Sequence, residues 1–244
     1  MSGFMKSVAD NLVFVMEFLA VIVALFLVAL LLEKLNQKRQ GKKQKLFDTR
    51  RIVVIGMFSA LAAVLMVIEL PVFFAPPFYG LDFSELPILV GTFAFGPVAG
   101  VMMEFLKILL KLLFKPTSTA FVGELANFAV GCSFILPASA IYLFRKTKKG
   151  AIAGCVVGTL VMTVFGTAFN AIYLLPAFAR MFMPMEAILA AGAEVNPLMK
   201  EGSIISFVIV CVAPLNLMKG AADSLVTLLV YKPLSPILKA GHKM

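Results

Sequence analysis

The sequence predicts an all-α integral membrane protein built from seven apolar helices. Of its 244 residues, 61% are hydrophobic and 14% are charged, and the mean hydropathy is +1.00. A soluble domain is about half apolar and about a quarter charged, so the composition excludes an ordinary soluble fold. At roughly 20 residues for each spanning helix, the chain has room for six or seven spans. Its basic residues gather in short polar stretches between apolar runs, as is typical of loops at a cytoplasmic membrane surface.

The apolar blocks follow one another along the whole chain. They cover residues 12–32, 51–69, 84–96, 101–114, 120–144, 151–178 and 202–230. The first block is too long for a signal peptide and lacks a small-residue cleavage site, so we expect an uncleaved helix with its N-terminus outside. Residues 1–50 are therefore expected to form an extra transmembrane helix with a basic cytoplasmic linker, and residues 51–244 the main membrane domain. The connection at 181–197 is predicted to be a loop.

The basic residues are distributed asymmetrically over these connections. Eight of the 22 lysines and arginines lie within 34–51, and four lie within 145–149. Fifteen in all fall on one predicted side of the membrane and four on the other. The richer side is expected to be cytoplasmic, and it includes the C-terminus. The net charge of +9 is thereby explained without nucleic-acid binding.

Motifs of catalysis and metal binding are missing from the sequence. The three cysteines lie far apart in apolar runs, and the single histidine is near the C-terminus, so neither a zinc site nor a disulfide framework is predicted. The chain has no phosphate-binding loop and should not hydrolyse ATP. We predict no cofactor and no enzyme activity, and the enzyme alternative is reduced to a membrane enzyme of unknown chemistry.

Polar side chains form three stripes at helical spacing within the apolar blocks. The stripes are Glu104, Lys107 and Lys111; Glu124, Asn127 and Gly131; and Asn216, Lys219 and Asp223. Charged residues inside a membrane are costly and are functional candidates by default. For Glu104–Lys107 and Lys219–Asp223, ion pairs within one helix are an equally good interpretation. An asparagine amide both donates and accepts hydrogen bonds, and Asn127 and Asn216 together with Lys219 favour ligand contact.

Small residues recur at four-residue spacing on the second apolar block. Gly56 and Ala60 form one such pair, and Ser59 and Ala63 form another. Small side chains at this spacing let another helix approach closely. By composition alone, packing within the protein is the preferred interpretation, and contact with a partner is the alternative.

The stretch APPFYGLDFSELP, residues 75–87, lies between two apolar blocks. Its prolines favour an extended backbone, so the stretch cannot continue a helix. Asp82 or Ser84 is expected to cap the helix that follows, and capping is also the preferred role of Glu85. Gly80 is expected to act as a hinge.

Three blocks together resemble a known transporter family. They are FFAPPFYGLDFSELPILVGTFAFGPVAG, GELANFAVG and PLNLMKGAADSLVTLLVYKPLSPIL. In order and spacing they are similar to the substrate-binding S component of energy-coupling factor (ECF) vitamin transporters, in its riboflavin-specific branch. The resemblance covers roughly residues 50–238. It implies a six-helix S-component bundle, to which the helix at 12–32 is an addition.

The resemblance implies capture of riboflavin from outside, with uptake driven by a separate transmembrane T subunit and two ATPase subunits. Asn127, Asn216 and Lys219 match the binding motifs of the family. The connection 70–83 matches its lid loop, in which Phe78, Tyr79, Gly80 and Leu81 are expected to cover the flavin. Glu124 and Lys107 are weaker ligand candidates. Gly56 and Ala60 match the small-residue contact with the T subunit.

Other functions remain open at this point. A different vitamin can occupy the same scaffold, because a fold does not determine its ligand. A stand-alone membrane carrier would transport without an ATPase partner. A membrane enzyme would turn over a small molecule.

Overall fold

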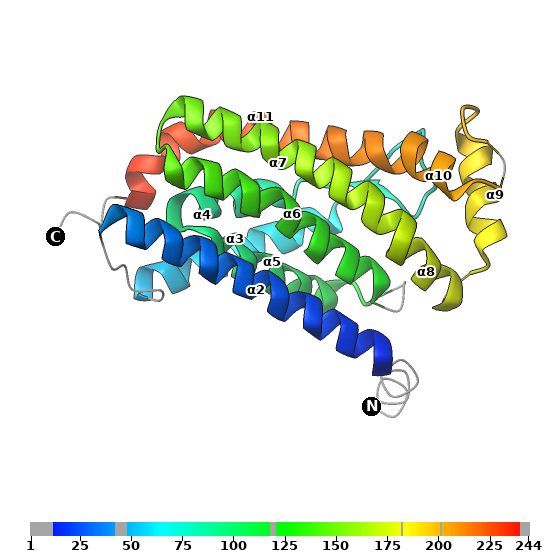
Figure 1. Ribbon diagram of the computed structural model, residues 1–244, viewed down its shortest axis with the longest axis horizontal. Coiled ribbons are helices and arrows are strands. Elements are labelled where there is room, and N and C mark those ends of the chain that lie inside the picture. Colours follow the sequence, from blue (N-terminus) through cyan, green and yellow to red (C-terminus); the bar gives the residue numbers. More distant parts are fainter. Residues whose placement is uncertain (1–11, 42–47, 118–120, 182, 201, 240–244) are drawn as a thin grey trace.

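The chain forms one elongated bundle of helices in a computed structural model that describes residues 12–41, 48–117, 121–181, 183–200 and 202–239 (Figure 1). The elements, in chain order, are α2 (Leu12–Gln40), α3 (Thr49–Val67), β1 (Leu70–Pro71), β2 (Gly80–Leu81), α4 (Glu85–Phe95), α5 (Pro97–Phe114), α6 (Val122–Phe144), α7 (Lys148–Phe169), η1 (Asn170–Leu174), α8 (Leu175–Met181), α9 (Met185–Val195), α10 (Ile204–Phe207), η2 (Val208–Val212) and α11 (Ala213–Lys239). The elements η1 and η2 are π-helical turns that continue long helices without a break.

Five helical stretches among the described residues are long and apolar enough to cross a membrane. They are Met16–Arg39, Thr49–Val67, Val122–Phe144, Lys148–Arg180 and Ile204–Leu234. The 11 residues of α4 extend only about 16 Å, and α4 turns into α5 at Gly96, which has a positive φ of 95°. The all-α membrane fold, with α2 as an extra helix before the main bundle, is confirmed.

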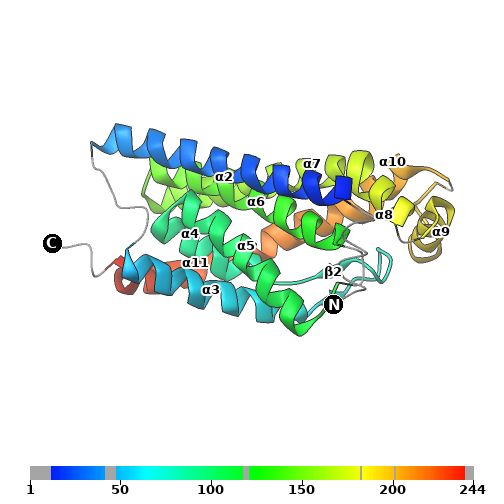
Figure 2. The same cartoon turned by 90° about the horizontal axis from the view of Figure 1, so that it is seen from below.

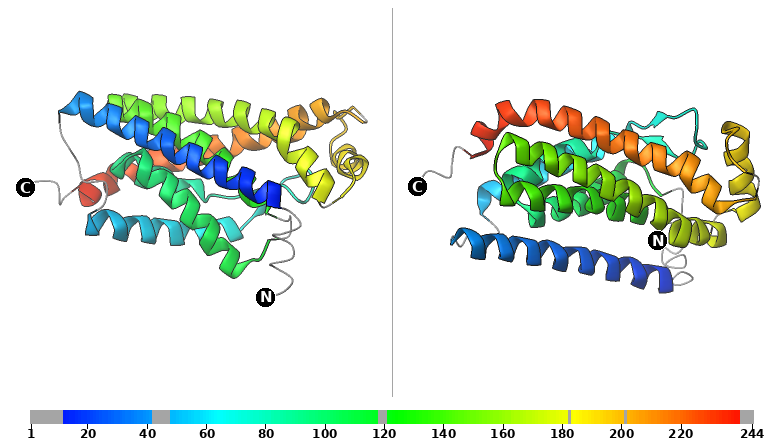
Figure 3. Two further views of the ribbon diagram at one scale, coloured as in Figure 1. Left: turned by 60° about the horizontal axis from the view of Figure 1, so that its bottom comes forward. Right: turned by 45° about the horizontal axis from the view of Figure 1, so that its top comes forward.

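Some local structure differs from the prediction. The helix α2 continues to Gln40, so residues 34–40 are helical rather than linker, and the remaining linker residues 42–47 lie outside the described part. Within the predicted loop 181–197, α9 forms an 11-residue helix that lies across the end of the bundle (Figure 3). A short antiparallel hairpin joins Leu70 to Leu81 and Pro71 to Gly80. Apolar length, the main signal for spans, does not detect elements this short.

The extra helix α2 packs along α5 and α6, and α5 lies between α2 and α3 (Figure 2). Near the end of α2, the buried Glu33 accepts a 2.7 Å hydrogen bond from the Arg51 guanidinium at the start of α3. The other oxygen of Glu33 accepts the Val98 amide at 3.2 Å, at the N-terminus of α5. A carboxylate is favoured at a helix N-terminus because the first amides have no partner within the helix. One side chain thus ties α2 to two helices of the main bundle.

Close contact between α6 and α7 depends on glycines at four-residue spacing. A Cβ at Gly154 would lie 2.6 Å from the Ala138 carbonyl oxygen, and one at Gly158 would lie 2.7 Å from that of Phe134. Because neither position can hold a larger side chain without displacing α6, the two backbones meet directly. This packing places the continuation of α7, the turn η1, beside α6 and η2.

Candidate ligand-binding site

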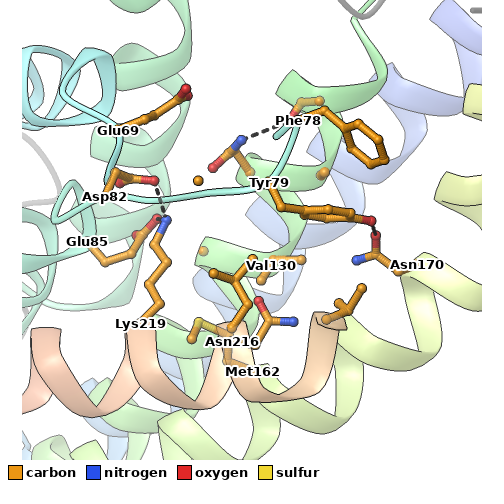
Figure 4. A pocket seen from close by; sticks show the side chains of 17 residues that line it. Glu69, Phe78, Tyr79, Asp82, Glu85, Val130, Met162, Asn170, Asn216 and Lys219 are labelled. Carbon is orange, nitrogen blue, oxygen red and sulfur yellow. Dashed lines mark hydrogen bonds and ion pairs between the residues drawn. The ribbon is translucent and has the colours of Figure 1, made fainter. Parts of the chain in front are cut away.

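A cavity of about 150 Å³ lies between the connection 70–83, α6, η1 and α11 (Figure 4). Its described polar wall consists of three carboxylates, three amides and one ammonium group. These are Glu69, Asp82 and Glu85; Asn127, Asn170 and Asn216; and Lys219. The described residues contain no cluster of metal-ligating side chains. The cavity therefore offers hydrogen-bond donors and acceptors in one small volume, beside the aromatic rings of Phe78 and Tyr79.

Asn216, on α11, is the amide with the greatest unused capacity. Its side chain is 7% exposed, and its Nδ2 has no hydrogen-bond partner among the described residues. A Cβ at Gly166 of α7 would lie 2.6 Å from that nitrogen, so glycine makes the space that this amide occupies. A buried donor without a partner costs about 1–3 kcal/mol. A ligand carbonyl in the cavity would remove that cost.

Asn127, on α6, is partly committed to its own helix. Its Nδ2 donates to the Gly123 carbonyl at 3.0 Å. The structure gives its Oδ1 no donor among the described residues. This amide can therefore accept a hydrogen bond from a ligand in the cavity, and it retains one further N–H.

Lys219 belongs to a buried group of charges that joins α4, α5 and α11. Its Nζ lies 2.8 Å from Asp82 Oδ2 and 3.7 Å from Glu85 Oε1. Glu85 also receives Lys107 at 2.8 Å, and Lys107 pairs with Glu104 at 2.6 Å. Burial makes such charges stable only in pairs. The group therefore fixes the lysine at the wall of the cavity (Figure 4).

The connection 70–83 covers the cavity. Its ends are held together by the β1–β2 hairpin, and the Tyr79 amide donates to the Pro76 carbonyl at 2.9 Å. The ring of Phe78 lies 5.7 Å from Phe178 of α8, and the ring of Tyr79 lies 6.1 Å from Phe207 of α10. We refer to residues 70–83 as the lid.

Tyr79 connects the lid to the wall of the cavity. Its hydroxyl donates a 2.7 Å hydrogen bond to Asn170 Oδ1 in η1, and the Asn170 amide donates to the Gly166 carbonyl at 2.8 Å. Burial of the hydroxyl raises the pKa of Tyr79 above its ordinary value. The phenol therefore keeps its proton, and the bond to Asn170, throughout the neutral pH range.

The structure brings six of the nine predicted ligand residues together. The cavity wall includes Phe78, Tyr79, Gly80, Asn127, Asn216 and Lys219. The other three, Leu81, Glu124 and Lys107, do not form part of the described wall. Leu81 is buried in β2, and Glu124 accepts Lys111 at 2.7 Å. Lys107 is fully buried beside its two carboxylates.

Two local interpretations need correction. The ion pair Glu104–Lys107 exists within α5, but Lys219 pairs with Asp82 rather than with Asp223. The Asp223 carboxylate has no hydrogen-bond partner among the described residues. Glu85 is not a cap, since its carboxylate lies between two lysines. Gly80 sits in β2 without a positive φ, and its expected role as a hinge stays a prediction.

Of the two expected caps, the Ser84 side chain makes no capping hydrogen bond at the start of α4, whereas Asp82 accepts the amide of Ser84, the residue before α4, through Oδ1 at 2.9 Å. Asp82 therefore has two roles, because its other oxygen holds Lys219. The sequence analysis did not identify Asn170 or Glu69 as wall residues. An asparagine within an apolar run is itself a signal, and it identifies Asn170. Glu69 ends an apolar block and gives no such signal.

The two small-residue pairs of α3 face in different directions. Ser59 and Ala63 are buried in the bundle, whereas Gly56 and Ala60 are exposed. A Cβ added at Gly56 would meet no atom within 4 Å. Packing within the protein therefore explains the first pair and does not explain the second.

Comparison with known proteins gives consistent results. Residues 50–231 match the family model described as ECF transporter, substrate-specific component. The chain is 36% identical over 198 residues to the riboflavin transporter RibU of Staphylococcus aureus, which covers 81% of this chain and 97% of that protein. It is 27% identical over 188 residues to the riboflavin transporter FmnP of Bacillus subtilis, covering 77% and 93% of the two chains.

A solved structure agrees with these relatives. It is the S component of a bacterial ECF transporter, at 37% identity and a TM-score of 0.60. The match covers 78% of this chain and 97% of the solved chain.

Proposed function

This chain belongs to the substrate-specific components of ECF transporters, and on that premise we propose that it captures riboflavin from outside the cell. The observation that carries the proposal is the buried, unpartnered amide of Asn216 in a cavity with an aromatic lid. Riboflavin has an imide edge that presents an N–H between two carbonyls. The Asn216 amide donates to one carbonyl, and Asn127 accepts the imide N–H or donates to the other.

The remaining wall suits the rest of such a ligand. Lys219 keeps one N–H beyond its contacts with Asp82 and Glu85, and this donor serves a ring carbonyl or a ribityl hydroxyl. Phe78 and Tyr79 supply flat apolar area against the ring system. Leu81, Glu124 and Lys107 support the wall from behind rather than contacting the flavin.

Uptake then requires partners that this chain lacks. We propose that release inside depends on an ECF T subunit and two ATPase subunits. The exposed face of α3 around Gly56 and Ala60 is the surface proposed for the T subunit, because small side chains there admit a second helix.

The proposed orientation places the C-terminus and the α6–α7 turn in the cytoplasm. Arg145, Lys146, Lys148 and Lys149 lie at that turn. The end of the bundle with α8 and α9 is opposite to it (Figure 1). The cavity, bordered by η1 and the lid, is nearer that second end, and it would open to the outside. The N-terminus before α2 would also be outside.

The test is a titration of riboflavin with the purified full chain in detergent, followed by quenching of flavin fluorescence. The chain has no tryptophan, so the ligand supplies the signal. We expect saturable one-to-one binding and a loss of about ten-fold or more in affinity for Asn216→Ala. Asn127→Ala should lose less, because one of its N–H groups is already bonded within α6.

Ser133→Ala is the control, since this hydroxyl of α6 bonds to the Val130 carbonyl and lies outside the cavity wall. Its affinity should equal that of the unchanged protein. A flat titration of well-folded protein would exclude riboflavin. Thermal unfolding in the presence of other vitamins, which a bound ligand would delay, would then identify a different ligand on the same scaffold.

A further inference from the structure

One buried asparagine outside the cavity wall connects three segments at the end of the bundle. Asn196 follows α9 and is 6% exposed. Its Nδ2 lies 3.1 Å from the carbonyl oxygen of Phe74 in the lid, and 3.1 Å from that of Val210 in η2. A longer contact to the Cys211 sulfur measures 3.9 Å. Among the residues described at this end, Asn196 is the one whose side chain donates to both the lid and η2.

The orientation of this amide is determined by its surroundings. The oxygen Oδ1 accepts the Leu198 amide N–H at 3.1 Å, whereas both neighbours of Nδ2 are carbonyl oxygens. Exchanging the two ends of the amide would place oxygen against oxygen twice and leave the Leu198 amide without its acceptor. Since an amide nitrogen is only a donor, both of its hydrogens are used in holding the lid and η2.

The two segments held by Asn196 both border the cavity. The lid carries Phe78 and Tyr79, and η2 ends at Val212, which lines the wall one turn before Asn216. A π-helical turn departs from the regular α-helical pattern, and here the Val210 carbonyl accepts a side-chain donor. Besides the Asp82–Lys219 ion pair near its end, the lid is therefore tied by the Tyr79 hydroxyl to Asn170 and by the Phe74 carbonyl to Asn196.

The size of the cavity shows why these ties matter. At about 150 Å³, it is well below the ~300–1,000 Å³ of pockets that hold ligands of drug size. A three-ring ligand needs more space than this, and movement of the lid would provide it. Movement of the lid at Phe74 breaks the bond to Asn196, because donor and acceptor lie on separate segments.

We propose that Asn196 is a positioning residue that latches the lid, and that it sets the rate at which riboflavin enters and leaves. The proposal rests on the function proposed above. The latch holds the lid through a backbone carbonyl and does not line the cavity. It therefore stabilises the closed lid with and without ligand, and its loss accelerates association and dissociation together.

The matching variant is Asn196→Asp. Aspartate keeps the acceptor for the Leu198 amide and removes the N–H groups that reach Phe74 and Val210. Stopped-flow flavin fluorescence should show both rate constants rising by about 3- to 10-fold, the value of one or two hydrogen bonds. The dissociation constant, their ratio, should change by less than about two-fold. A residue that contacts the flavin would change dissociation alone, and a merely structural residue would change neither rate in folded protein.

Ser203→Ala is the matched control on the same connection. The Ser203 hydroxyl caps α10 by accepting the Ser206 amide at 3.1 Å and has no bond to the lid in the described structure. Its two rate constants should stay unchanged. Unchanged rates in folded Asn196→Asp would overturn the latch. If Asn196→Asp does not fold, Asn196→Ser is used instead, because it shortens the side chain without adding charge.

Hydrogen–deuterium exchange of the ligand-free protein tests the latch independently of which vitamin the protein binds. Amides of residues 72–79 should exchange faster in Asn196→Asp than in the unchanged chain or in Ser203→Ala. This result would support the latch even if riboflavin does not bind. Equal exchange in all three proteins would exclude it, whatever the ligand.

Discussion

At the scale of single residues, Lys219 shows how a charge is kept beside the cavity that we propose for riboflavin. Its ammonium group meets Asp82 at 2.8 Å and Glu85 at 3.7 Å. An isolated ammonium group would be costly in this low-dielectric position. The two carboxylates offset that cost and leave one N–H directed to the cavity. The lysine therefore acts as a hydrogen-bond donor held in place, with its charge already compensated.

Asp223 differs from Asp82 in having no donor. It is fully buried on α11, and neither oxygen has a hydrogen-bond partner among the described residues. We expect Asp223→Asn to raise the free energy of unfolding by about 1 kcal/mol, because a neutral amide is less costly to bury than an unpaired carboxylate. Riboflavin affinity should stay within about two-fold, since Asp223 does not line the described cavity. Thermal unfolding in detergent and the flavin titration measure the two quantities.

Asp82→Asn is the matched variant, with the same chemical change in the same buried group of charges. Here the carboxylate has a partner, so the change should destabilise the protein by about 3–5 kcal/mol. Equal destabilisation by both variants would show that Asp223 has a donor that the described structure does not contain.

At the scale of elements, the spans follow directly from the sequence, because a membrane requires helices that satisfy their own backbone groups. Apolar length therefore located α3, α6 and the continuous helical stretches Lys148–Arg180 and Ile204–Leu234 to within a few residues. The stripes at helical spacing also placed Asn127, Asn216 and Lys219 on two helices that face one cavity. Both results depend on periodicity within one helix, which the sequence displays.

Periodicity within one helix does not predict which residues on different elements interact. Asp82 and Lys219 are 137 residues apart. The residues next to Asp82 in the sequence predict only that it caps the helix that follows. The same limit led to the pairing of Lys219 with Asp223. The helix α9 and the β1–β2 hairpin are too short for a periodic signal, yet they hold the lid.

The extra helix α2 is joined to the main bundle by a buried ion pair, which predicts a coupling between elements. Removing either Glu33 or Arg51 takes away one half of this buried ion pair and should cost about 3–5 kcal/mol. We expect Glu33→Gln and Arg51→Leu each to lower the unfolding temperature. The double variant should be less destabilised than the sum of the two, and thermal unfolding of the ligand-free protein tests this. Strict additivity would show that α2 is attached without this contact.

At the scale of the whole molecule, the cavity, the basic α6–α7 turn and the exposed face of α3 lie on different parts of the protein. The lid and η1 border the cavity toward the end of the bundle with α9, and the basic α6–α7 turn lies at the other end (Figure 1). Along the side, α2 covers α5 and α6, but it leaves Gly56 and Ala60 of α3 exposed. An added helix on the outward face of α3 would block the surface proposed for the T subunit. Because α2 packs on α5 and α6 instead, it leaves that surface open.

This arrangement predicts that ligand binding and assembly can be separated. Gly56→Leu and Ala60→Leu add bulk to an exposed face where Gly56 has no neighbour within 4 Å. Riboflavin affinity should therefore stay within about two-fold of the unchanged protein, because no buried contact is lost. Close approach of a second helix depends on small side chains, so co-purification with the T and ATPase subunits and ATP-dependent uptake should fall by about ten-fold or more.

Ala153→Leu makes the same change on the exposed face of α7 and should leave all three measurements unaltered. Equal loss of assembly in Ala153→Leu would mean that bulk anywhere on the lipid-facing surface interferes, and normal assembly of both α3 variants would place the partner on another face.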